Sequence, residues 1–426
     1  MHKKTAIIGG GAAGLMAAAT IEELAPETGV LLFEKNAQLG SKVLISGGGR
    51  CNVTTGIFDV KELLKNYPRG AKFLMSAMFR FPPEKVIEWF EDHGVKMKTE
   101  EDLRVFPASN NGKDIVGALG SGLKRAEAGV AGTGAQFFLN AIVEKIEKVG
   151  SDGGKPKRGG AKFKIFLKDG RNFEVDSVII TTGGNAYRQT GSTGDGYAFA
   201  KSLGHSITKL APSLHSFLVK DTWVSKLAGV AFKKAKITVG KYERTGSFVF
   251  THKGVSGPAI FALSSMAAYE DFSPEKPLKI NINFFPEEKP EELKKRFILL
   301  TEQNGKKFLV NFLDLFLPKS LAEVFCEILK IAPKHTVATL NKSQRDAILG
   351  LFQNMKLEAT GRGAGDEFVT AGGVDSSEVN TNTMESKICP GLYFAGEILD
   401  IDGFTGGFNL QAAWATGRLA GENAIQ

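Results

Sequence analysis

The chain has 426 residues, of which 42% are hydrophobic and 23% charged, a composition typical of a soluble globular protein with two or three domains. Its three widely separated cysteines (Cys51, Cys326 and Cys389) argue against a disulfide framework and favour a reducing cytoplasm, and neither cysteines nor histidines show a zinc spacing. No apolar run could cross a bilayer, and the net charge of +8 fits either an anionic partner or a solvated basic surface.

The first predicted unit runs from Thr5 to Glu34 in the order strand, glycine turn, helix, strand. Gly9, Gly11 and Gly14 match the dinucleotide-binding fingerprint, in which glycines permit a tight turn, close approach of a pyrophosphate and helix packing. The helix N-terminus would face the phosphates, and Glu34 lies where a carboxylate bonds ribose hydroxyls. A secretory signal peptide is the alternative, but three consecutive glycines and the strand ending at Glu34 argue against it.

A second glycine-rich loop, GSKVLISGGGRCN, occupies residues 40–52. Such a loop suits backbone that lies against a ligand, although a surface loop is the alternative. Together with the fingerprint and Glu34-Lys35, it resembles the HI0933-like flavoprotein family, which includes YhiN-type and BaiN-type FAD oxidoreductases. The resemblance implies that this loop wraps FAD near its pyrophosphate and isoalloxazine. The residues it assigns to FAD here, besides those of the fingerprint, are Ala12, Ala13, Lys35, Lys42, Ser46, Gly47, Gly48, Arg50, Cys51 and Asn52.

The following stretch mixes helical and extended patterns. Helices are predicted over 60–66, 71–79, 83–93 and 112–127, and strands over 162–167 and 172–175. Residues 136–148 follow the strand pair on the adenine side of two-dinucleotide flavoproteins, with Val143 as a backbone contact, and 150–160 is predicted to be a mobile hairpin tip. A buried strand from Asp176 then enters a turn at Thr182, Gly183 and Gly184, which resembles the family's turn with Thr181 in place of the usual Ala.

From Tyr197 the pattern changes to short β-branched runs, typical of an antiparallel barrel or sandwich, and then to helices over 288–352 with breaks at Pro318 and Pro333. Residues 248–260 resemble the family's second signature. The resemblance implies an α/β fold: a Rossmann-type FAD-binding domain of the two-dinucleotide-binding flavoprotein class, interrupted by a β-barrel-like domain and a small helical domain. The expected boundaries are 1–196 with 356–426, then 197–286, then 287–355.

The C-terminal segment returns to the first domain. A strand over 391–395 ends in a turn, and an Ala-rich helix extends to about Ala420, so that its N-terminus would stabilise negative charge on a reduced flavin. For Asp400 and Asp402, a turn or N-cap role is the alternative to a catalytic one. The residues of this segment that the resemblance assigns to FAD are Gly396, Glu397, Asp402, Gly407, Phe408, Asn409 and Leu410.

The chemistry expected from the resemblance is non-covalent FAD passing a hydride to a conjugated C=C bond of a small molecule. Only one glycine fingerprint is present, so NAD(P)H would bind transiently. Candidate catalytic residues are Arg50, Cys51, Asn52 and His252, with small-residue packing as the alternative for Cys51 and strand-end packing for His252. A second hypothesis takes RNA uridine as substrate, since its C5=C6 bond is also conjugated to a carbonyl. A third is a flavin-binding redox protein without turnover. The oligomeric state stays open.

Overall fold

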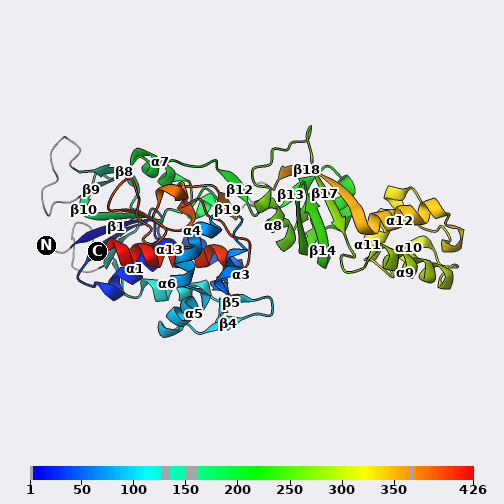
Figure 1. Ribbon diagram of the computed structural model, residues 1–426, viewed down its shortest axis with the longest axis horizontal. Coiled ribbons are helices and arrows are strands. Elements are labelled where there is room, and N and C mark those ends of the chain that lie inside the picture. Colours follow the sequence, from blue (N-terminus) through cyan, green and yellow to red (C-terminus); the bar gives the residue numbers. More distant parts are fainter. Residues whose placement is uncertain (1–2, 126–134, 150–161, 364–367) are drawn as a thin grey trace. The chain divides into compact units, whose positions relative to one another are not determined.

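A computed structural model describes residues 3–125, 135–149, 162–363 and 368–426. Its contacts divide the chain into two compact units, Met1–Pro212 with Phe368–Gln426, and Ser213–Glu367. Figure 1 shows both. The expected hairpin tip over 150–160 lies wholly outside the described residues. No helix in the described part of the chain is long and apolar enough to cross a membrane.

The first unit is built on a six-stranded parallel sheet, which confirms the Rossmann-type fold predicted for this part of the chain. Ile7 of the central strand lies opposite Ile179 on one side and Leu32 on the other, and all three side chains are fully buried. A sheet buried on both faces requires such continuous apolar strands. The strands are, in spatial order, β20 (Leu392–Phe394), β11 (Ser177–Ile180), β1 (Lys4–Ile8), β2 (Gly29–Phe33), β7 (Ala135–Phe138) and β6 (Lys124–Arg125).

Two helices, α1 (Ala12–Leu24) and α13 (Phe408–Ala424), pack closely against each other in this unit (Figure 1). A Cβ atom added to Gly417 would lie 2.5 Å from the carbonyl oxygen of Ala13, so only glycine permits this approach. The C-terminal helix runs four residues beyond the predicted end at Ala420. Its close contact with α1 ties the chain terminus to the glycine turn.

The remaining elements of the first unit are short. Its helices are α2 (Ser41–Ile45), α3 (Val60–Leu64), α4 (Ala71–Arg80), α5 (Pro83–Asp92), α6 (Gly112–Gly120) and α7 (Asp195–Ser202). Its smaller sheets are β3 (Thr54–Thr55), β5 (Arg104–Pro107) and β4 (Met97–Thr99); β10 (Asn172–Val175), β9 (Phe163–Leu167) and β8 (Val143–Lys148); and β12 (Ala211–Ser213) with β19 (Val369–Ala371).

Two predictions in this unit are wrong in detail. The helix predicted over 112–127 ends at Gly120, because Gly120 and Gly122 interrupt it, and the chain continues into β6. The strands expected to pair over 136–148 instead join different sheets: β7 lies beside β2, and β8 beside β9. Asn140, with φ of 53°, turns the chain between them.

The second unit contains a closed six-stranded barrel, as the β-barrel-like prediction required (Figure 1). Its long hairpin pairs Val239 with Tyr242, and the strands alternate buried and exposed side chains. The barrel strands are, in spatial order, β13 (Phe217–Val219), β16 (Gly254–Ser256), β15 (Tyr242–Phe250), β14 (Ala231–Val239), β17 (Leu278–Asn283) and β18 (Met355–Arg362). The helices of the unit are α8 (Pro258–Met266), α9 (Pro290–Gln303), α10 (Leu309–Leu313), α11 (Lys319–Leu329) and α12 (Lys342–Asn354).

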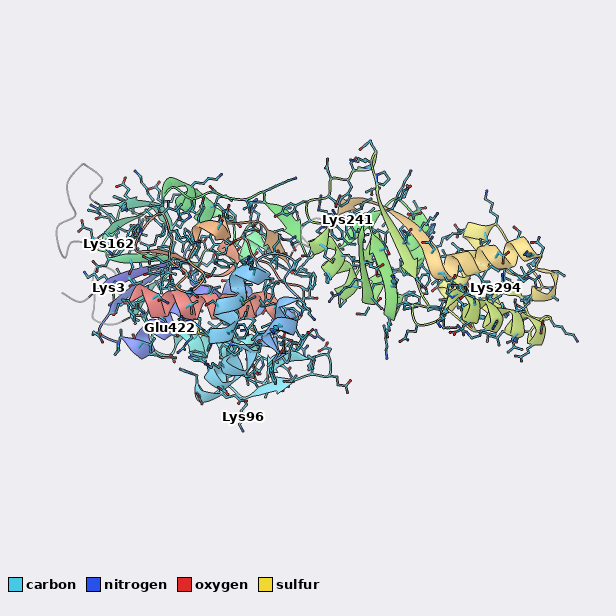
Figure 2. The ribbon with its side chains drawn as sticks, in the orientation of Figure 1. Lys3, Lys96, Lys162, Lys241, Lys294 and Glu422 are labelled. Carbon is cyan, nitrogen blue, oxygen red and sulfur yellow. The ribbon has the colours of Figure 1, made fainter. Side chains whose placement is uncertain are left out.

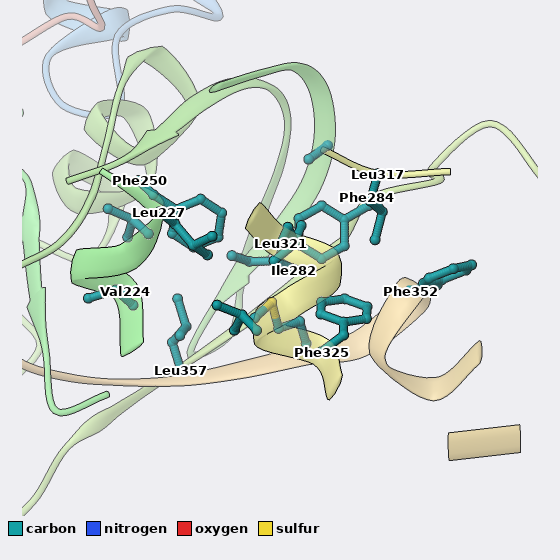
Figure 3. Close-up of a cluster of buried hydrophobic side chains, with 14 of the residues drawn as sticks. Val224, Leu227, Phe250, Ile282, Phe284, Leu317, Leu321, Phe325, Phe352 and Leu357 are labelled. Atoms are coloured by element: carbon teal, nitrogen blue, oxygen red, sulfur yellow. The ribbon is translucent and has the colours of Figure 1, made fainter. Parts of the chain in front are cut away.

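The barrel and helices α9 to α12 share one hydrophobic core (Figure 3). The ring of Phe325 lies 6.2 Å from that of Phe284 and 5.9 Å from that of Phe352, measured between centroids. Burying each such side chain contributes roughly 1.5 to 3 kcal/mol. The division of this insert into two domains stays a prediction, whereas its contacts join barrel and helices in one compact unit.

Within the first unit, a buried histidine links the segment before β20 to the end of α7. His205 follows α7, and its side chain is fully buried. Its Nδ1 lies 3.1 Å from Oε2 of Glu378, and its Nε2 lies 2.8 Å from Oγ of Ser386. The pair of contacts thus holds both ends of the segment 378–386.

This contact predicts a pH dependence of stability. Burial lowers the pKa of His205 below its ordinary value of 6.5, although the Glu378 carboxylate opposes the shift. Because the folded pKa is the lower one, the stability from neutral His205 is complete above about pH 6.5 and is lost as the pH falls below it. We expect His205→Gln to cost roughly 1 to 3 kcal/mol near neutral pH and less in acid. Thermal unfolding across this range measures it, and equal losses at both ends would contradict it.

Candidate functional site

The glycine turn between β1 and α1 leaves an open helix N-terminus. Gly11 precedes α1, no side chain caps it, and the first turn contains no acidic residue. A Cβ atom added to Gly11 would meet nothing within 4 Å, whereas one on Gly14 would lie 2.0 Å from the carbonyl oxygen of Gly9. Since the first N–H groups of a helix have no intrahelical partner, this end can bind a phosphate. Ala12 and Ala13 form its first turn.

Glu34 lies beside this turn, immediately after β2. One carboxylate oxygen accepts from the N–H of Gly10 and the other from that of Asn36, both at 2.8 Å. The residue is 7% exposed, and burial raises the pKa of its carboxyl, an effect that the two backbone bonds partly offset. Each oxygen keeps a further acceptor position, so a ribose hydroxyl can still bond there.

The second glycine loop is a run of left-handed backbone. Gly47, Gly48 and Gly49 have φ of 57°, 71° and 88°, and Cys51 has φ of 61°. A Cβ atom on Gly48 would meet nothing within 4 Å, so the backbone there faces open space. Ser46 closes the start of the loop by donating its hydroxyl to the carbonyl of Val43 at 2.8 Å. The geometry allows a ligand to approach the backbone at Gly48.

Lys35 and Lys42, which the resemblance assigned to FAD, each form an ion pair with a carboxylate far away in the chain. Lys42 in α2 contacts Glu397 at 2.9 Å, and the other oxygen of Glu397 accepts from the N–H of Thr370 at 3.0 Å. Lys35 contacts Asp195, the first residue of α7, at 2.7 Å. Gly396 precedes Glu397 with φ of 77°. The carboxylates therefore fix both lysines within the unit.

The end of β11 carries unpaired polar atoms. The hydroxyl of Thr182 and the side-chain oxygen of Asn185 are buried and have no hydrogen-bond partner within the described ranges. Gly183 and Gly184 lie between them, and the preceding Thr181 donates its hydroxyl to the carbonyl of Gly9 at 2.8 Å. Buried polar groups are ordinarily bonded, so these atoms fit a site for a polar ligand next to the glycine turn.

Arg50, Cys51 and Asn52 make contacts within the protein. The Arg50 guanidinium lies 3.8 Å from the centre of the Phe106 ring and 2.7 Å from Glu100. Cys51 is fully buried, and burial raises the pKa of its thiol to about 12, which opposes thiolate chemistry near neutral pH. Their catalytic roles stay predictions.

Asn52 links the glycine loop to the start of α13. In the orientation that satisfies its amide, the nitrogen donates to the carbonyls of Val105 and Thr54 at 3.2 and 3.0 Å. The oxygen accepts from the N–H of Gly407 at 2.9 Å. These three bonds use the amide for positioning, and whether it also contacts a cofactor stays a prediction.

The start of α13 is a second helix N-terminus without a side-chain cap or an acidic first turn. Asn409 closes the loop before it through two bonds of 2.8 Å with the backbone of Gly403. Tyr67 donates to the carbonyl of Phe408 at 2.7 Å, and Leu410 lies in the same first turn. This end can stabilise negative charge, as the sequence led us to expect.

Asp402 and Asp400 precede this loop. The Asp402 side chain is fully buried, and its two carboxylate oxygens accept hydrogen bonds from two guanidinium nitrogens of Arg69. Burial raises the pKa of Asp400, and one of its oxygens is buried without a partner among the described residues. Sequence reasoning missed Arg69, Glu100 and Phe106, because no local pattern marks residues whose partners lie elsewhere in the chain.

Two predicted residues lie apart from these loops. Val143 begins β8 in the separate three-stranded sheet. His252 belongs to the second unit, where it is exposed in the turn between β15 and β16. The structure thus gathers the glycine turn, the second glycine loop and the start of α13 in one unit, and leaves His252 in the other.

The comparisons with known proteins agree with this geometry. The family described as HI0933-like protein Rossmann domain matches residues 3–423. A 3-dehydro-bile acid delta(4,6)-reductase from Clostridium scindens is 30% identical, and the alignment covers 99% of this chain and 98% of the relative. A ribosomal RNA dihydrouridine synthase from Escherichia coli is also 30% identical, and the alignment covers 98% of this chain and 97% of that relative.

A solved flavocytochrome c3 fumarate reductase in its open conformation is similar in fold, with a TM-score of 0.51 and 16% identity. It covers 100% of this chain, which covers 78% of that one. Fold, glycine turn and family match define the class as an FAD-dependent oxidoreductase with a Rossmann-type domain. The chain belongs to the HI0933-like family.

Proposed function

We propose that this protein reduces a C=C bond conjugated to a carbonyl, with NAD(P)H as the transient electron donor. FAD, when bound, supplies the hydride chemistry. Two relatives that match nearly the whole chain support the reaction type: a delta(4,6)-reductase acts on the double bonds of a 3-oxo compound, and a dihydrouridine synthase saturates uracil. In both substrates the double bond is conjugated to a carbonyl, which makes one carbon electrophilic. A cytoplasmic location is part of the proposal.

The observation that carries the proposal is the pair of uncapped helix N-termini, α1 and α13, in one unit with the left-handed glycine loop. The α1 end is suited to hold the pyrophosphate of FAD, and the α13 end to stabilise negative charge on its ring system. Asn52 connects the loop to α13 through Gly407. We assign these residues to binding and orienting the cofactor.

A small 3-oxo alkene is the first candidate substrate, and uridine in ribosomal RNA is the second. The second is favoured by the charge distribution. Residues 213–367 contain 23 Lys and Arg against 17 Asp and Glu, so they hold most of the net charge of +8. Phosphate contacts supply much of the affinity of proteins for nucleic acids, and they require such an excess.

Anaerobic stopped-flow spectroscopy of the FAD-loaded protein tests the proposal. We expect NADH or NADPH to bleach the flavin absorbance, and a 3-oxo-Δ4,6 steroid or unmodified ribosomal RNA to restore it. The protein reduced with dithionite separates the two half-reactions, since it needs no nucleotide. Failure of both substrates to reoxidise dithionite-reduced protein would contradict the proposal and favour a redox protein without turnover.

A further inference from the structure

Two segments of the α9–α12 helices carry positive charge only. Residues 303–313 and 328–345 contain no Asp or Glu, yet they include six cations. These are Lys306, Lys307, Lys330, Lys334, Lys342 and Arg345. A scattered basic surface would mix both signs, so this separation of charge singles out one region of the second unit.

The fold brings the two segments together. Phe308 and Thr336 form an isolated antiparallel bridge, and four backbone hydrogen bonds of 2.8 to 3.1 Å join 305–310 to 333–338. Lys306, Lys307 and Lys334 are exposed on the paired loops. Cations from different parts of the sequence therefore share one surface, which we call the basic loop surface and define as residues 305–308 and 330–336.

None of the six cations forms an ion pair or a side-chain hydrogen bond with any residue that the structure describes. Elsewhere in this unit many cations have carboxylate partners: Lys294, which stands on α9 in Figure 2, lies 3.6 Å from Asp346, and Lys226 lies 2.6 Å from Glu327. Glu302 and Asp314 flank the first segment in sequence without pairing with these lysines. The charge of the basic loop surface is thus available to an external anion.

Two further features of the surface are unfavourable for a solvated loop. Phe308 is 44% exposed between Lys307 and buried Leu309. Lys330 ends α11 with φ of 54°, a left-handed position at which glycine is the usual residue. An exposed ring beside free cations offers base stacking and phosphate neutralisation together, the combination that binds single-stranded nucleic acid.

We propose that the basic loop surface docks the phosphate backbone of single-stranded RNA, with Phe308 stacking on a base. The inference rests on the RNA form of the proposed function and assigns its partner to one surface. An acidic protein would satisfy the cations but would make no use of an exposed ring among them. The proposal assigns these residues to RNA binding alone and gives them no part in the chemistry.

The test is a titration of fluorescein-labelled, unmodified single-stranded ribosomal RNA fragments at several salt concentrations. We expect Lys306→Gln/Lys307→Gln/Lys334→Gln to weaken binding at least tenfold and to lower the slope of log K against log salt by about 2, at about 0.7 per lost phosphate contact. A matched control, Lys233→Gln/Lys279→Gln/Lys356→Gln, removes the same charge from the barrel. Its three lysines are exposed and lie on strands β14, β17 and β18. Flavin content and reduction of a 3-oxo alkene should stay unchanged in both.

Two single variants separate binding from folding. Lys330→Gly removes a cation and relieves the left-handed backbone, so it should weaken RNA binding without lowering the melting temperature. Phe308→Ala should weaken binding several-fold with an unchanged salt slope. If Lys330→Gly destabilised the fold, the Gln triple variant would still decide the matter.

Four results would contradict the proposed RNA-binding surface. The first three are no RNA binding by the wild type, wild-type affinity in the triple variant, and an equal loss of affinity in the control variant. The fourth is competition by poly-glutamate as strong as that by unlabelled RNA, which would indicate an acidic protein as the partner. Failure of this inference differs from failure of the proposed function. A wild-type protein that reduces the alkene but does not bind RNA would contradict only the RNA-binding surface. A wild-type protein that binds RNA but turns over neither substrate would contradict only the proposed reductase function.

Discussion

A Gly11→Ala protein is expected to fold normally and to bind FAD roughly 10- to 100-fold more weakly, equivalent to about 1.4 to 2.8 kcal/mol. The backbone at Gly11 has φ of −85° and ψ of −166°, which alanine adopts without strain. Its added Cβ would meet no protein atom within 4 Å, so the fold has room for it. That space lies before the N-terminus of α1, where the pyrophosphate would come closest. The methyl group would therefore displace the ligand alone.

The matched variants are two other glycine-to-alanine changes. Gly14→Ala places a Cβ 2.0 Å from the carbonyl oxygen of Gly9, so it should destabilise the fold itself by about 3 kcal/mol or more. Gly117→Ala lies in the exposed middle of α6 with nothing within 4 Å and should stabilise slightly. Urea unfolding of the FAD-free proteins and flavin titration separate stability from binding. A Gly11→Ala protein that retains wild-type FAD affinity would place the cofactor elsewhere.

The sequence predicts the fold well wherever the signal is local. The turn at Gly9 to Gly14, the buried strand ending at Ile180 and the helices after Pro290 follow from short patterns. The predictions are wrong where they depend on which strand pairs with which. Residues 135–148 contain two strands as expected, but which sheet each joins depends on side chains distant in sequence.

The site shows the same division. Glycines and Glu34 are recognisable because backbone conformation and strand ends impose them directly. The contacts of Arg50 with Glu100 and Phe106 cross some fifty residues, and no spacing announces them. The resemblance names Asp402 but not its partner Arg69, which lies 333 residues away and whose only local mark is the left-handed Gly70 beside it.

Replacing Arg69 with Met is expected to destabilise the first unit by about 3 to 5 kcal/mol. The guanidinium is 14% exposed and the Asp402 carboxylate 0%, so the variant leaves a buried negative charge without its cation. Arg69→Lys should cost less, because an ammonium keeps the charge but loses the two-pronged contact. Since Asp402 leads directly into the loop that Asn409 closes, flavin retention should fall with stability.

The double variant Arg69→Met/Asp402→Leu decides whether the buried charge is the cause. It removes both charges, and we expect it to be more stable than Arg69→Met alone, because apolar side chains tolerate burial there. The control is Lys65→Met, whose pair with Glu62 is 69% and 58% exposed and should contribute at most about 1 kcal/mol. Urea unfolding measures all four proteins. An Arg69→Met protein as stable as Lys65→Met would show that water or another cation replaces the guanidinium, and Asp402 would then be available to contact the flavin directly.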